Sequence, residues 1–331
     1  MNQPFTREAP FVLGLPSLGF GAAAVGNLYT AVSDAAAAAT IAAAVAGGIR
    51  LFDTSPFYGH GLSEMRLGKG LLGIADIMVS TKVGRSLAVG EDPGDTGFVD
   101  AARARPYFDY SRAGVLAQVE GSCARLGRSR IDIALVHDIG AVTHGDAHPT
   151  RFREALDGAF PALADLQAQG VVGTIGIGVN EVAVALETLD TASVDVILLA
   201  GRYTLLDQTA LDVLLSRCVA RGVTVIVGGP YNSGVLAGGD HFDYGAVSPA
   251  VRARVTALAA VCARHGVPLA AAALQFPLAH PAVATVIPGA RSAAEVEANL
   301  ALLAVAIPAQ LWADLRNAGL LHPDAPVPIG R

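Results

Sequence analysis

Short apolar segments rich in β-branched residues recur eight times along the chain. Several of them contain apolar residues at consecutive positions, such as 133–136 and 196–199, which is typical of strands covered on both faces. Stretches with helical spacing of apolar residues separate them. The predicted strands are 17–20, 49–53, 77–82, 132–136, 173–178, 195–199, 223–227 and 283–287, and the predicted helices are 34–46, 63–72, 112–126, 152–169, 181–189, 211–221, 249–265, 269–279 and 293–303.

Strand–helix alternation repeated eight times predicts a closed parallel α/β barrel, the (β/α)8 TIM barrel. No linker rich in Pro, Gly and Ser divides the sequence, so we expect a single domain over residues 1–331. A further helix is expected to begin at Pro308. The long glycine-bearing segment 88–110 is predicted to be a loop over the barrel mouth. An open doubly wound sheet remains the alternative fold.

Composition narrows the function classes. Hydrophobic residues make up 52% of the 331 residues, and charged residues make up 16% with a net charge of −6. The mean hydropathy of +0.47 reflects alanine and valine, and stretches such as 35–49 are shorter than the roughly 18 apolar residues of a spanning helix. We therefore expect an ordered protein with no nucleic-acid or membrane partner. Three separated cysteines and a polar segment 1–10 predict a cytoplasmic protein without a secretory signal.

Four polar residues lie at or just beyond the ends of predicted strands: Asp53, Tyr58, Lys82 and His137. A free phenol has a pKa of about 10, and an adjacent ammonium group is expected to lower it. We predict Tyr58 as the acid/base, Lys82 as its activator, Asp53 as the partner of Lys82, and His137 as the group that orients a substrate oxygen. Taken singly, each could serve structure alone. Their shared position at strand ends favours an active site.

These residues lie in motifs that resemble the aldo-keto reductases. The stretch from Phe52 to Gly68 is similar to the first signature of that family, and 80–82 and 286–292 are similar to its lysine and cofactor motifs. The resemblance covers about residues 12–320. It implies a barrel with an Asp–Tyr–Lys–His tetrad, a bound nicotinamide cofactor, and hydride transfer between that cofactor and a carbonyl or alcohol carbon.

A narrower resemblance, in 108–111, 200–206 and 228–234, is to the aldose 1-dehydrogenase branch. That branch includes L-fucose, D-threo-aldose and L-galactose dehydrogenases and the related pyridoxal 4-dehydrogenase. Sugars and pyridoxal both close into cyclic hemiacetals, so we predict oxidation of a small-molecule hemiacetal to a lactone. Pyridoxal oxidation to 4-pyridoxolactone is the alternative. Because the phenolate is the competent base, oxidation is expected to be fastest at alkaline pH. The oligomeric state stays open.

The resemblance also implies the residues that bind the cofactor. Glu295 would repel a 2′-phosphate and could accept a hydrogen bond from a free 2′-hydroxyl, so NAD is favoured over NADP. The alternative role for Glu295 is a first-turn carboxylate that complements the helix dipole. The predicted cofactor residues are Gly21, Asn180, Gly228, Gly229, Ser233, Gly289, Arg291, Ser292, Glu295 and Asn299.

Other positions depart from the family pattern. Where the family has Ser-Asn, a Gln and a stacking ring, this chain has Gly178-Val179-Asn180, Ala200 and Gly228. Aromatic rings and an arginine suit a sugar or a pyridine ring. The expected substrate contacts are therefore Tyr110, Arg202, Tyr231 and Trp312, with Trp312 alternatively pinning the last helix to the barrel.

Competing hypotheses use parts of the same sequence. The segment from Gly19 to Ala24 fits a loose dinucleotide pattern but lacks the following acidic residue, so a tight turn is favoured. The polar run 137–148, with three histidines and two aspartates, fits no compact metal pattern, and no metal is predicted. A cofactor-binding regulatory barrel without turnover and a lyase with Lys82 as Schiff-base nucleophile remain alternatives from other classes.

Overall fold

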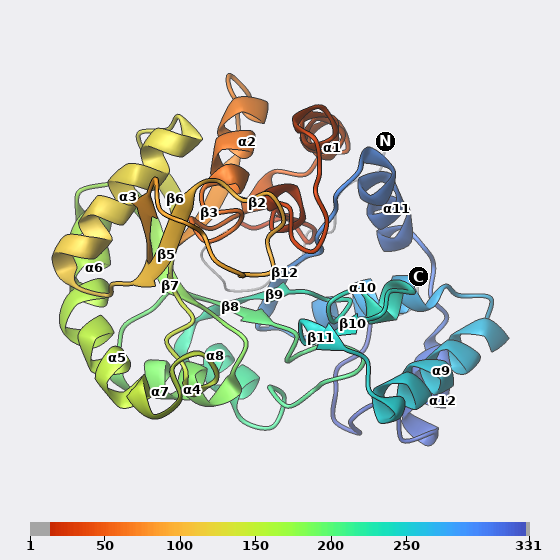
Figure 1. Ribbon diagram of the computed structural model, residues 1–331. Helices are drawn as coiled ribbons and strands as arrows, with labels where there is room; N and C mark the ends of the chain where they lie inside the picture. The colour runs from red at the N-terminus through yellow and green to blue at the C-terminus, as the bar shows by residue number, and fades with distance from the viewer. Residues whose placement is uncertain (1–13, 329–331) are drawn as a thin grey trace. The chain divides into compact units, whose positions relative to one another are not determined.

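The computed structural model describes residues 14–328. Within this range an eight-stranded sheet runs in the order β1-β2-β3-β6-β7-β8-β9-β12, and its recorded pairings are parallel. Two bridges, Leu18↔Val286 and Gly21↔Gly289, join the first strand region to the last. The fold is a (β/α)8 barrel, as predicted (Figure 1). Its strands are β1 (Phe20–Gly21), β2 (Leu51–Asp53), β3 (Met78–Val83), β6 (Ile131–His137), β7 (Val172–Val179), β8 (Val196–Ala200), β9 (Thr224–Gly228) and β12 (Val283–Ile287).

Helices follow the strands. The helices are α1 (Asp34–Ala46), α2 (Leu62–Gly70), α3 (Arg112–Leu126), α4 (Ala141–His144), α5 (His148–Glu154), α6 (Phe160–Ala168), α7 (Val182–Thr191), α8 (Leu214–Arg221), α9 (Pro249–Arg264), α10 (Leu269–Gln275), α11 (Ala293–Leu303) and α12 (Ala309–Asn317). Among the described residues no single helix is long and apolar enough to cross a membrane. The bent pair Pro249–Arg264 and Leu269–Ala279, meeting at 99°, reaches that length and apolarity only together.

The chain divides into two compact units, which we describe separately. The amino-terminal unit comprises residues 19–198 and 289–297, and the carboxy-terminal unit comprises the described residues of 1–18, 199–288 and 298–331. The prediction of one domain over the whole chain stays a prediction.

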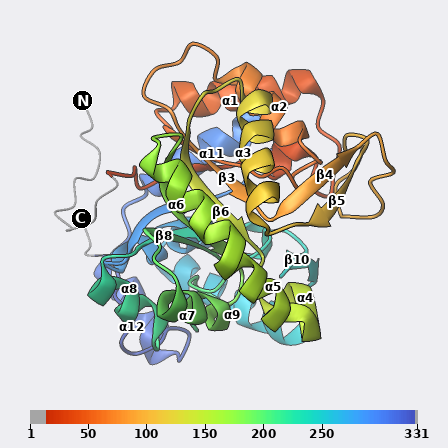
Figure 2. The same cartoon turned by 90° about the vertical axis from the view of Figure 1, so that its left-hand side faces the viewer.

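In the amino-terminal unit, parallel register aligns the carboxyl ends of neighbouring strands. Asp53 pairs with Ser80, Lys82 pairs with Leu135, and His137 pairs with Gly178. Helices α1, α2 and α3 lie outside strands β2, β3 and β6 (Figure 1), and α3 and α6 lie side by side (Figure 2). The side chains that end these strands are therefore gathered at one edge of the sheet.

The segment 88–110, predicted to be a loop, contains a β-hairpin strand instead. β4 (Arg85–Val89) and β5 (Ala104–Phe108) pair antiparallel from Arg85↔Phe108 to Val89↔Ala104, and the hairpin stands away from the helices in Figure 2. The prediction was wrong because the glycines of the segment lie at positions 90, 94 and 97, whereas the strand 104–108 contains none. Pro106 is tolerated there because it lies on an edge strand of a two-stranded hairpin.

Three helix bounds also differ from prediction. The segment predicted as one helix, 152–169, is α5 and α6 joined by a π-helical stretch at Ala155–Ala159, and it begins earlier, at His148. Helix α8 begins at Leu214 rather than at 211. Helix α10 passes into a 3-10 turn at Phe276–Ala279.

In the carboxy-terminal unit, strands β9 and β12 pair in parallel from Val283↔Val225 to Ile287↔Gly228. Helix α12 begins after Pro308, as predicted. Two small strands, β10 (His241–Phe242) and β11 (Gly245–Ala246), form an antiparallel hairpin in the segment that follows β9.

Candidate active site

A buried ion pair lies at the carboxyl ends of β2 and β3. Lys82 Nζ donates to Asp53 Oδ2 at 2.7 Å and to the Thr54 carbonyl at 2.7 Å. Ser80 Oγ donates to the other carboxylate oxygen at 2.8 Å. A Cβ added to Gly178 would lie 3.3 Å from Lys82 Cε, so glycine lets the lysine stem pack against β7. The predicted partnership of Asp53 and Lys82 is present in the structure.

Tyr58 lies on the turn that follows β2, with its ring beside this pair. Lys82 Nζ lies 4.6 Å from the ring centroid. The centroid of the Tyr58 ring lies 5.9 Å from that of Phe98 and 6.1 Å from that of His137. Its backbone is held tightly, because a Cβ added to Gly26 would lie 2.9 Å from the Tyr58 carbonyl carbon. The four residues predicted as a tetrad therefore lie together in the amino-terminal unit.

The contacts of His137 favour one ring tautomer. Ser55 Oγ accepts the Phe57 N–H at 3.1 Å, so its own proton is available to His137 Nδ1, 3.4 Å away. On the other side of the ring, Nε2 faces Asp138 Oδ2 at 3.4 Å. An ionised carboxylate can only accept a hydrogen bond, so the ring nitrogen that faces it must carry the hydrogen. This arrangement favours Nε2–H, the tautomer that can donate to a substrate oxygen.

The pKa of the Tyr58 phenol differs from expectation. Burial raises this pKa well above its usual value, Asp53 and Asp138 raise it further, and Arg85 lowers it. The prediction of a pKa lowered by Lys82 was wrong in direction. Lys82 lies over the ring face, and its hydrogen bonds go to Asp53 and Thr54. Tyr58 is therefore a neutral phenol at neutral pH.

Burial also acts on the neighbouring groups. Desolvation lowers the pKa of His137 well below its usual value, and the cations Arg85 and Lys82 lower it further. Desolvation raises the pKa of Asp53, while Lys82 and Ser80 oppose that shift. His137 is therefore neutral at physiological pH and acts as a hydrogen-bond donor without a charge.

Arg85 and Asp138 form a second ion pair beside His137. Arg85 Nη2 lies 2.6 Å from Asp138 Oδ2. The guanidinium carbon lies 4.0 Å from the Phe57 ring centroid and 5.0 Å from that of Phe108. Sequence reasoning missed Arg85 and considered Asp138 only as a metal ligand. The available signal was position, since each follows a predicted strand within three residues of a tetrad member.

Tyr110, predicted to contact substrate, is fully buried. Its hydroxyl donates to the His137 carbonyl at 2.8 Å and lies 3.0 Å from His144 Nε2. The ring packs under Gly84, where an added Cβ would overlap it. The structure does not place Tyr110 where a substrate could reach it, because a positive φ at Gly84 turns the β3–β4 connection over its ring. Tyr110 supports the strand end that carries His137.

Among the cofactor residues of the amino-terminal unit, Arg291 and Glu295 contact each other. Glu295 Oε2 accepts the Arg291 N–H at 2.9 Å, and Oε1 accepts from Nε at 2.9 Å. Ser292 Oγ accepts the Glu295 N–H at 3.2 Å. Gly21 and Gly289 pair in a parallel bridge. Asn180 follows β7 directly.

The cofactor residues of the carboxy-terminal unit follow β9 and lie on α11. Gly228 ends β9, and Gly229 and Ser233 have positive φ values of 56° and 59°. Ser233 Oγ accepts the Tyr244 N–H at 3.0 Å. Tyr231, predicted as a substrate contact, donates its hydroxyl to Asn299 Oδ1 at 2.7 Å. These two predicted residues therefore bind each other.

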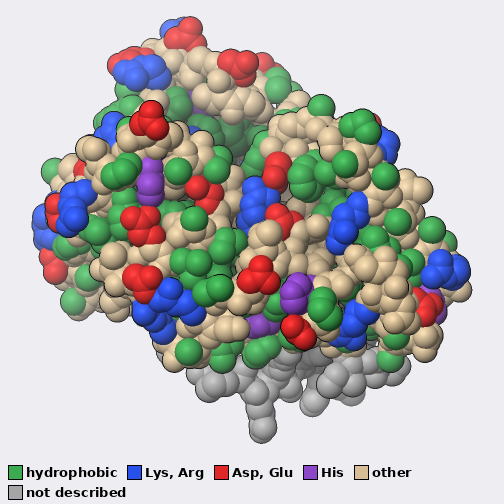
Figure 3. Space-filling view, turned by 90° about the horizontal axis from the view of Figure 1, so that it is seen from below, with side chains coloured by type: hydrophobic (Ala, Val, Ile, Leu, Met, Phe, Trp, Pro, Cys, Tyr) green, Lys and Arg blue, Asp and Glu red, His purple; other side chains and the backbone are tan. Residues whose placement is uncertain are grey.

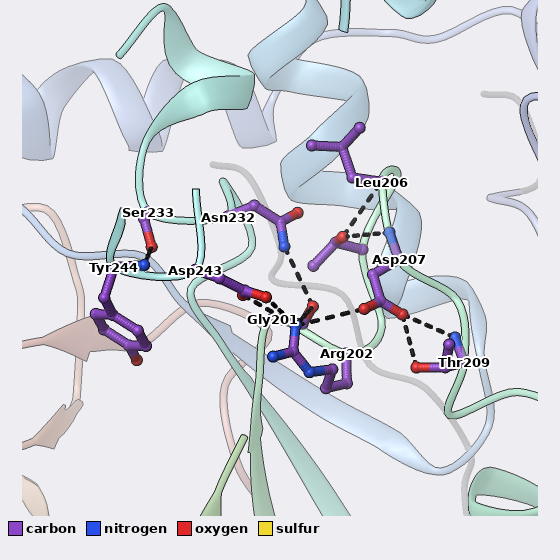
Figure 4. A network of polar contacts seen from close by, with 10 residues as sticks. Gly201, Arg202, Leu206, Asp207, Thr209, Asn232, Ser233, Asp243 and Tyr244 are labelled. Atoms are coloured by element: carbon purple, nitrogen blue, oxygen red, sulfur yellow. Dashed lines mark hydrogen bonds and ion pairs between the residues drawn. The ribbon is translucent and has the colours of Figure 1, made fainter. Parts of the chain in front are cut away.

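Arg202 and Trp312 complete the predicted substrate contacts. Arg202 Nη1 lies 2.9 Å from both oxygens of Asp243 and 3.4 Å from Asp207 Oδ2 (Figure 4). It thereby joins the turn after β8 to the β10–β11 hairpin. Trp312 is fully buried, with its ring 6.2 Å from that of Phe276. Its position fits the alternative of a residue that pins α12.

Charge on one face and the metal-ligating side chains of residues 14–328 were compared with the site above. On the face drawn in Figure 3, acidic and basic side chains are interspersed among apolar and neutral ones. Among residues 14–328, no group of three or more His, Cys, Asp or Glu side chains is arranged to hold a metal ion.

Comparison with known proteins decides the family. The sequence pattern of the aldo/keto reductase family matches residues 17–319. The chain belongs to the aldo/keto reductase family. It is 39% identical to pyridoxal 4-dehydrogenase from Microbacterium luteolum over 326 residues, covering 93% of this chain and 95% of the relative. It is 38% identical to D-threo-aldose 1-dehydrogenase from a Pseudomonas species over 322 residues, with the same two coverages.

A solved structure agrees with this assignment. An aldo-keto reductase from Bacillus halodurans in its holo form superposes with a TM-score of 0.73 at 25% identity, covering 97% of each chain. As a member of the aldo/keto reductase family this chain is an oxidoreductase, and the nicotinamide cofactors NAD and NADP are those that the family uses. The predicted family, fold and enzyme class are confirmed.

Proposed function

We propose that this aldo/keto reductase oxidises a cyclic hemiacetal of a sugar, of the L-fucose or D-threo-aldose type, at its anomeric carbon to the lactone. The observation that carries the proposal is the cluster of Tyr58, Lys82, Asp53 and His137, which supplies an acid/base and an oxygen-orienting donor beside each other. The 38% identity to a D-threo-aldose 1-dehydrogenase over nearly the whole chain supports this substrate class.

The residues present fit a nicotinamide dinucleotide. Asn232 Oδ1 is buried and has no hydrogen-bond partner among the described residues. A Cβ added to Gly229 would meet no atom within 4 Å, and one added to Gly289 would meet only the Gly21 carbonyl oxygen at 3.7 Å. These positions leave room for a ligand to approach the backbone. We propose cofactor contacts for each unit by itself: residues 289–295 in the amino-terminal unit and residues 228–233 in the carboxy-terminal unit. When bound, the nicotinamide would accept a hydride from the hemiacetal carbon.

The chain's own residues move the proton and orient the oxygen. Tyr58, once ionised, removes the proton of the anomeric hydroxyl, and as a phenol it returns that proton when the reaction runs toward reduction. Lys82 places a positive charge beside the ring, and Asp53 holds the ammonium in place. The Nε2–H of His137 faces Asp138 Oδ2 at 3.4 Å in the structure, and with substrate bound it donates to the reacting oxygen instead and keeps that oxygen facing Tyr58. Tyr58, Lys82, Asp53 and His137 are thus the proposed catalytic group.

We favour NAD over NADP. The carboxylate of Glu295 pairs with Arg291 and offsets the positive charge that would attract a 2′-phosphate. The negative charge of Glu295 would itself repel that phosphate. We also propose a cytoplasmic location, which the three unpaired cysteines support.

A second candidate function is the oxidation of pyridoxal to 4-pyridoxolactone, favoured by the 39% identity to a pyridoxal 4-dehydrogenase. The same groups would act on its hemiacetal. Initial rates at 340 nm with L-fucose, D-arabinose, L-galactose and pyridoxal, each with NAD and NADP at pH 9, separate the two. A sugar preferred over pyridoxal supports the main proposal. A preference of about 100-fold for pyridoxal, roughly 3 kcal/mol of transition-state discrimination, replaces it with the second. Cofactor binding without turnover of any of these substrates would refute both.

A further inference from the structure

Asp138 adopts an unusual backbone conformation directly after His137. Its φ is 48°, in the left-handed region, which is unfavourable for most residues and less so for Asp. Its N–H still donates to the Gly178 carbonyl of β7 at 3.0 Å. Successive side chains of a strand normally point to opposite faces. The left-handed turn instead brings the Asp138 carboxylate to within 3.4 Å of His137 Nε2, beside the proposed reacting oxygen.

The two carboxylate oxygens of Asp138 differ in their contacts: Oδ2 has partners within the protein and Oδ1 has none among the described residues. Oδ2 takes both the Arg85 contact at 2.6 Å and the His137 contact at 3.4 Å. Among the described residues Oδ1 accepts no hydrogen bond. Asp138 and Arg85 are 19% and 16% exposed, so the pair is sheltered but still reached from outside. Such a carboxylate is suited to accept a hydrogen bond from a hydroxyl group of a ligand.

Arg85 fixes where that carboxylate points. The guanidinium is held against Phe57 and Phe108 and belongs to the β4–β5 hairpin, while Asp138 directly follows β6. The buried Arg85 Nε has no hydrogen-bond partner among residues 14–328. A planar guanidinium stacked on aromatic rings loses little further freedom when it binds a carboxylate. The pair is therefore ordered before any ligand arrives.

We propose that Asp138 recognises a hydroxyl on the carbon next to the reacting hemiacetal carbon, and that Arg85 is the positioning residue that holds its carboxylate. The inference rests on the proposed function and narrows the substrate to aldoses that carry a 2-hydroxyl. In such a ring the two oxygens are neighbours. His137 Nε2 would donate to the anomeric oxygen while Asp138 accepts from the 2-hydroxyl, which matches two polar groups 3.4 Å apart.

The test compares L-fucose with 2-deoxy-L-fucose in the wild-type protein and in Asp138→Asn. Asparagine tolerates the left-handed region but carries no charge. We expect wild type to favour L-fucose by about 30-fold in kcat/KM, which is roughly 2 kcal/mol at 1.4 kcal/mol per factor of ten. Asp138→Asn should narrow that ratio to about 3-fold. If Asp138 had a purely structural role, the substitution would lower kcat/KM equally for both substrates and leave their ratio unchanged.

Matched variants keep the result interpretable. Asp76→Asn makes the same substitution at an exposed aspartate with a φ of 59°, and it should retain the wild-type ratio. Arg85→Lys keeps the charge but loses the stacked plane. It should lower the ratio of kcat/KM for L-fucose to that for 2-deoxy-L-fucose, and it tests the inference if Asp138→Asn fails to fold.

Each outcome bears on the inference. A narrowed ratio in Asp138→Asn and Arg85→Lys, but not in Asp76→Asn, supports it. Activity on both sugars with the same ratio in all four proteins overturns the inference and leaves the proposed function standing. Wild-type protein that oxidises neither sugar overturns both together.

Discussion

The ammonium nitrogen of Lys82 lies 2.7 Å from a carboxylate oxygen of Asp53, and the two side chains are only 2% and 4% exposed. Removing one member of a buried ion pair leaves the other charge without compensation, at a cost of about 3–5 kcal/mol. In the folded protein each member of this pair therefore compensates the buried charge of the other, in addition to its role in the proposed chemistry.

We expect Lys82→Met to lower the free energy of unfolding by about 3 kcal/mol, because Asp53 loses its partner in a low-dielectric site. Denaturant unfolding measures the loss. The double variant Asp53→Leu with Lys82→Met removes both charges and should regain most of the stability. It should stay inactive in the 340 nm assay. A double variant as unstable as the single one would show that packing, rather than charge pairing, holds this region.

The pH dependence of oxidation follows from the raised pKa of Tyr58. At neutral pH the phenol is protonated, and the fraction of phenolate grows as pH rises. We expect kcat/KM for oxidation to increase from pH 6 to pH 10 in a pH-rate profile. Tyr58→Phe should lower the rate by about 10²- to 10⁴-fold and abolish the slope. An oxidation rate that falls steadily over the same range would contradict the role of Tyr58.

His137 should make stability depend on pH at the acidic side. Its pKa is depressed well below 6.5 in the folded state, so below pH 6.5 the unfolded chain binds the proton first. The stability contributed by neutral His137 is therefore present above pH 6.5 and is lost as pH falls toward the folded pKa. Urea unfolding between pH 4.5 and 8 should show this loss.

Substitution isolates the contribution of His137. His137→Gln should flatten the dependence of the unfolding free energy on pH in that window. His241→Gln at an exposed position should leave the dependence as it is in wild type. If the unfolding free energy of His137→Gln depends on pH as in wild type, groups other than His137 cause the loss of stability at acidic pH.

The strand ends of the barrel were predictable because consecutive apolar residues mark strands covered on both faces. The segment Val283–Ile287 has the predicted bounds, and Asp53, Lys82 and His137 lie at strand ends as expected. Parallel register then places these ends along one edge without any further information. The tetrad could be predicted for that reason.

Other features depend on tertiary packing that a linear pattern does not contain. The ring of Tyr110 looks like a surface aromatic in sequence, yet the turn at Gly84 covers it. The direction of the Tyr58 pKa depends on how much water its surroundings exclude. The Arg85–Asp138 pair joins residues 53 positions apart. The spacing of residues along the sequence does not indicate contacts between residues this far apart.

Glu295 should set the cofactor preference. Its carboxylate accepts two hydrogen bonds from Arg291, so Glu295→Arg would both release Arg291 and add a second cation. We expect the ratio of kcat/KM for NADP to that for NAD to rise at least about 10-fold, because charge-assisted bonds to a 2′-phosphate become available. Binding of NADPH, measured by calorimetry, should tighten in parallel.

Glu297→Arg, at an exposed position on the same helix α11, makes the same charge change and should leave both readouts near wild type. If Glu295→Arg and Glu297→Arg shift the ratio equally, the effect is general electrostatics, and Glu295 does not select the cofactor.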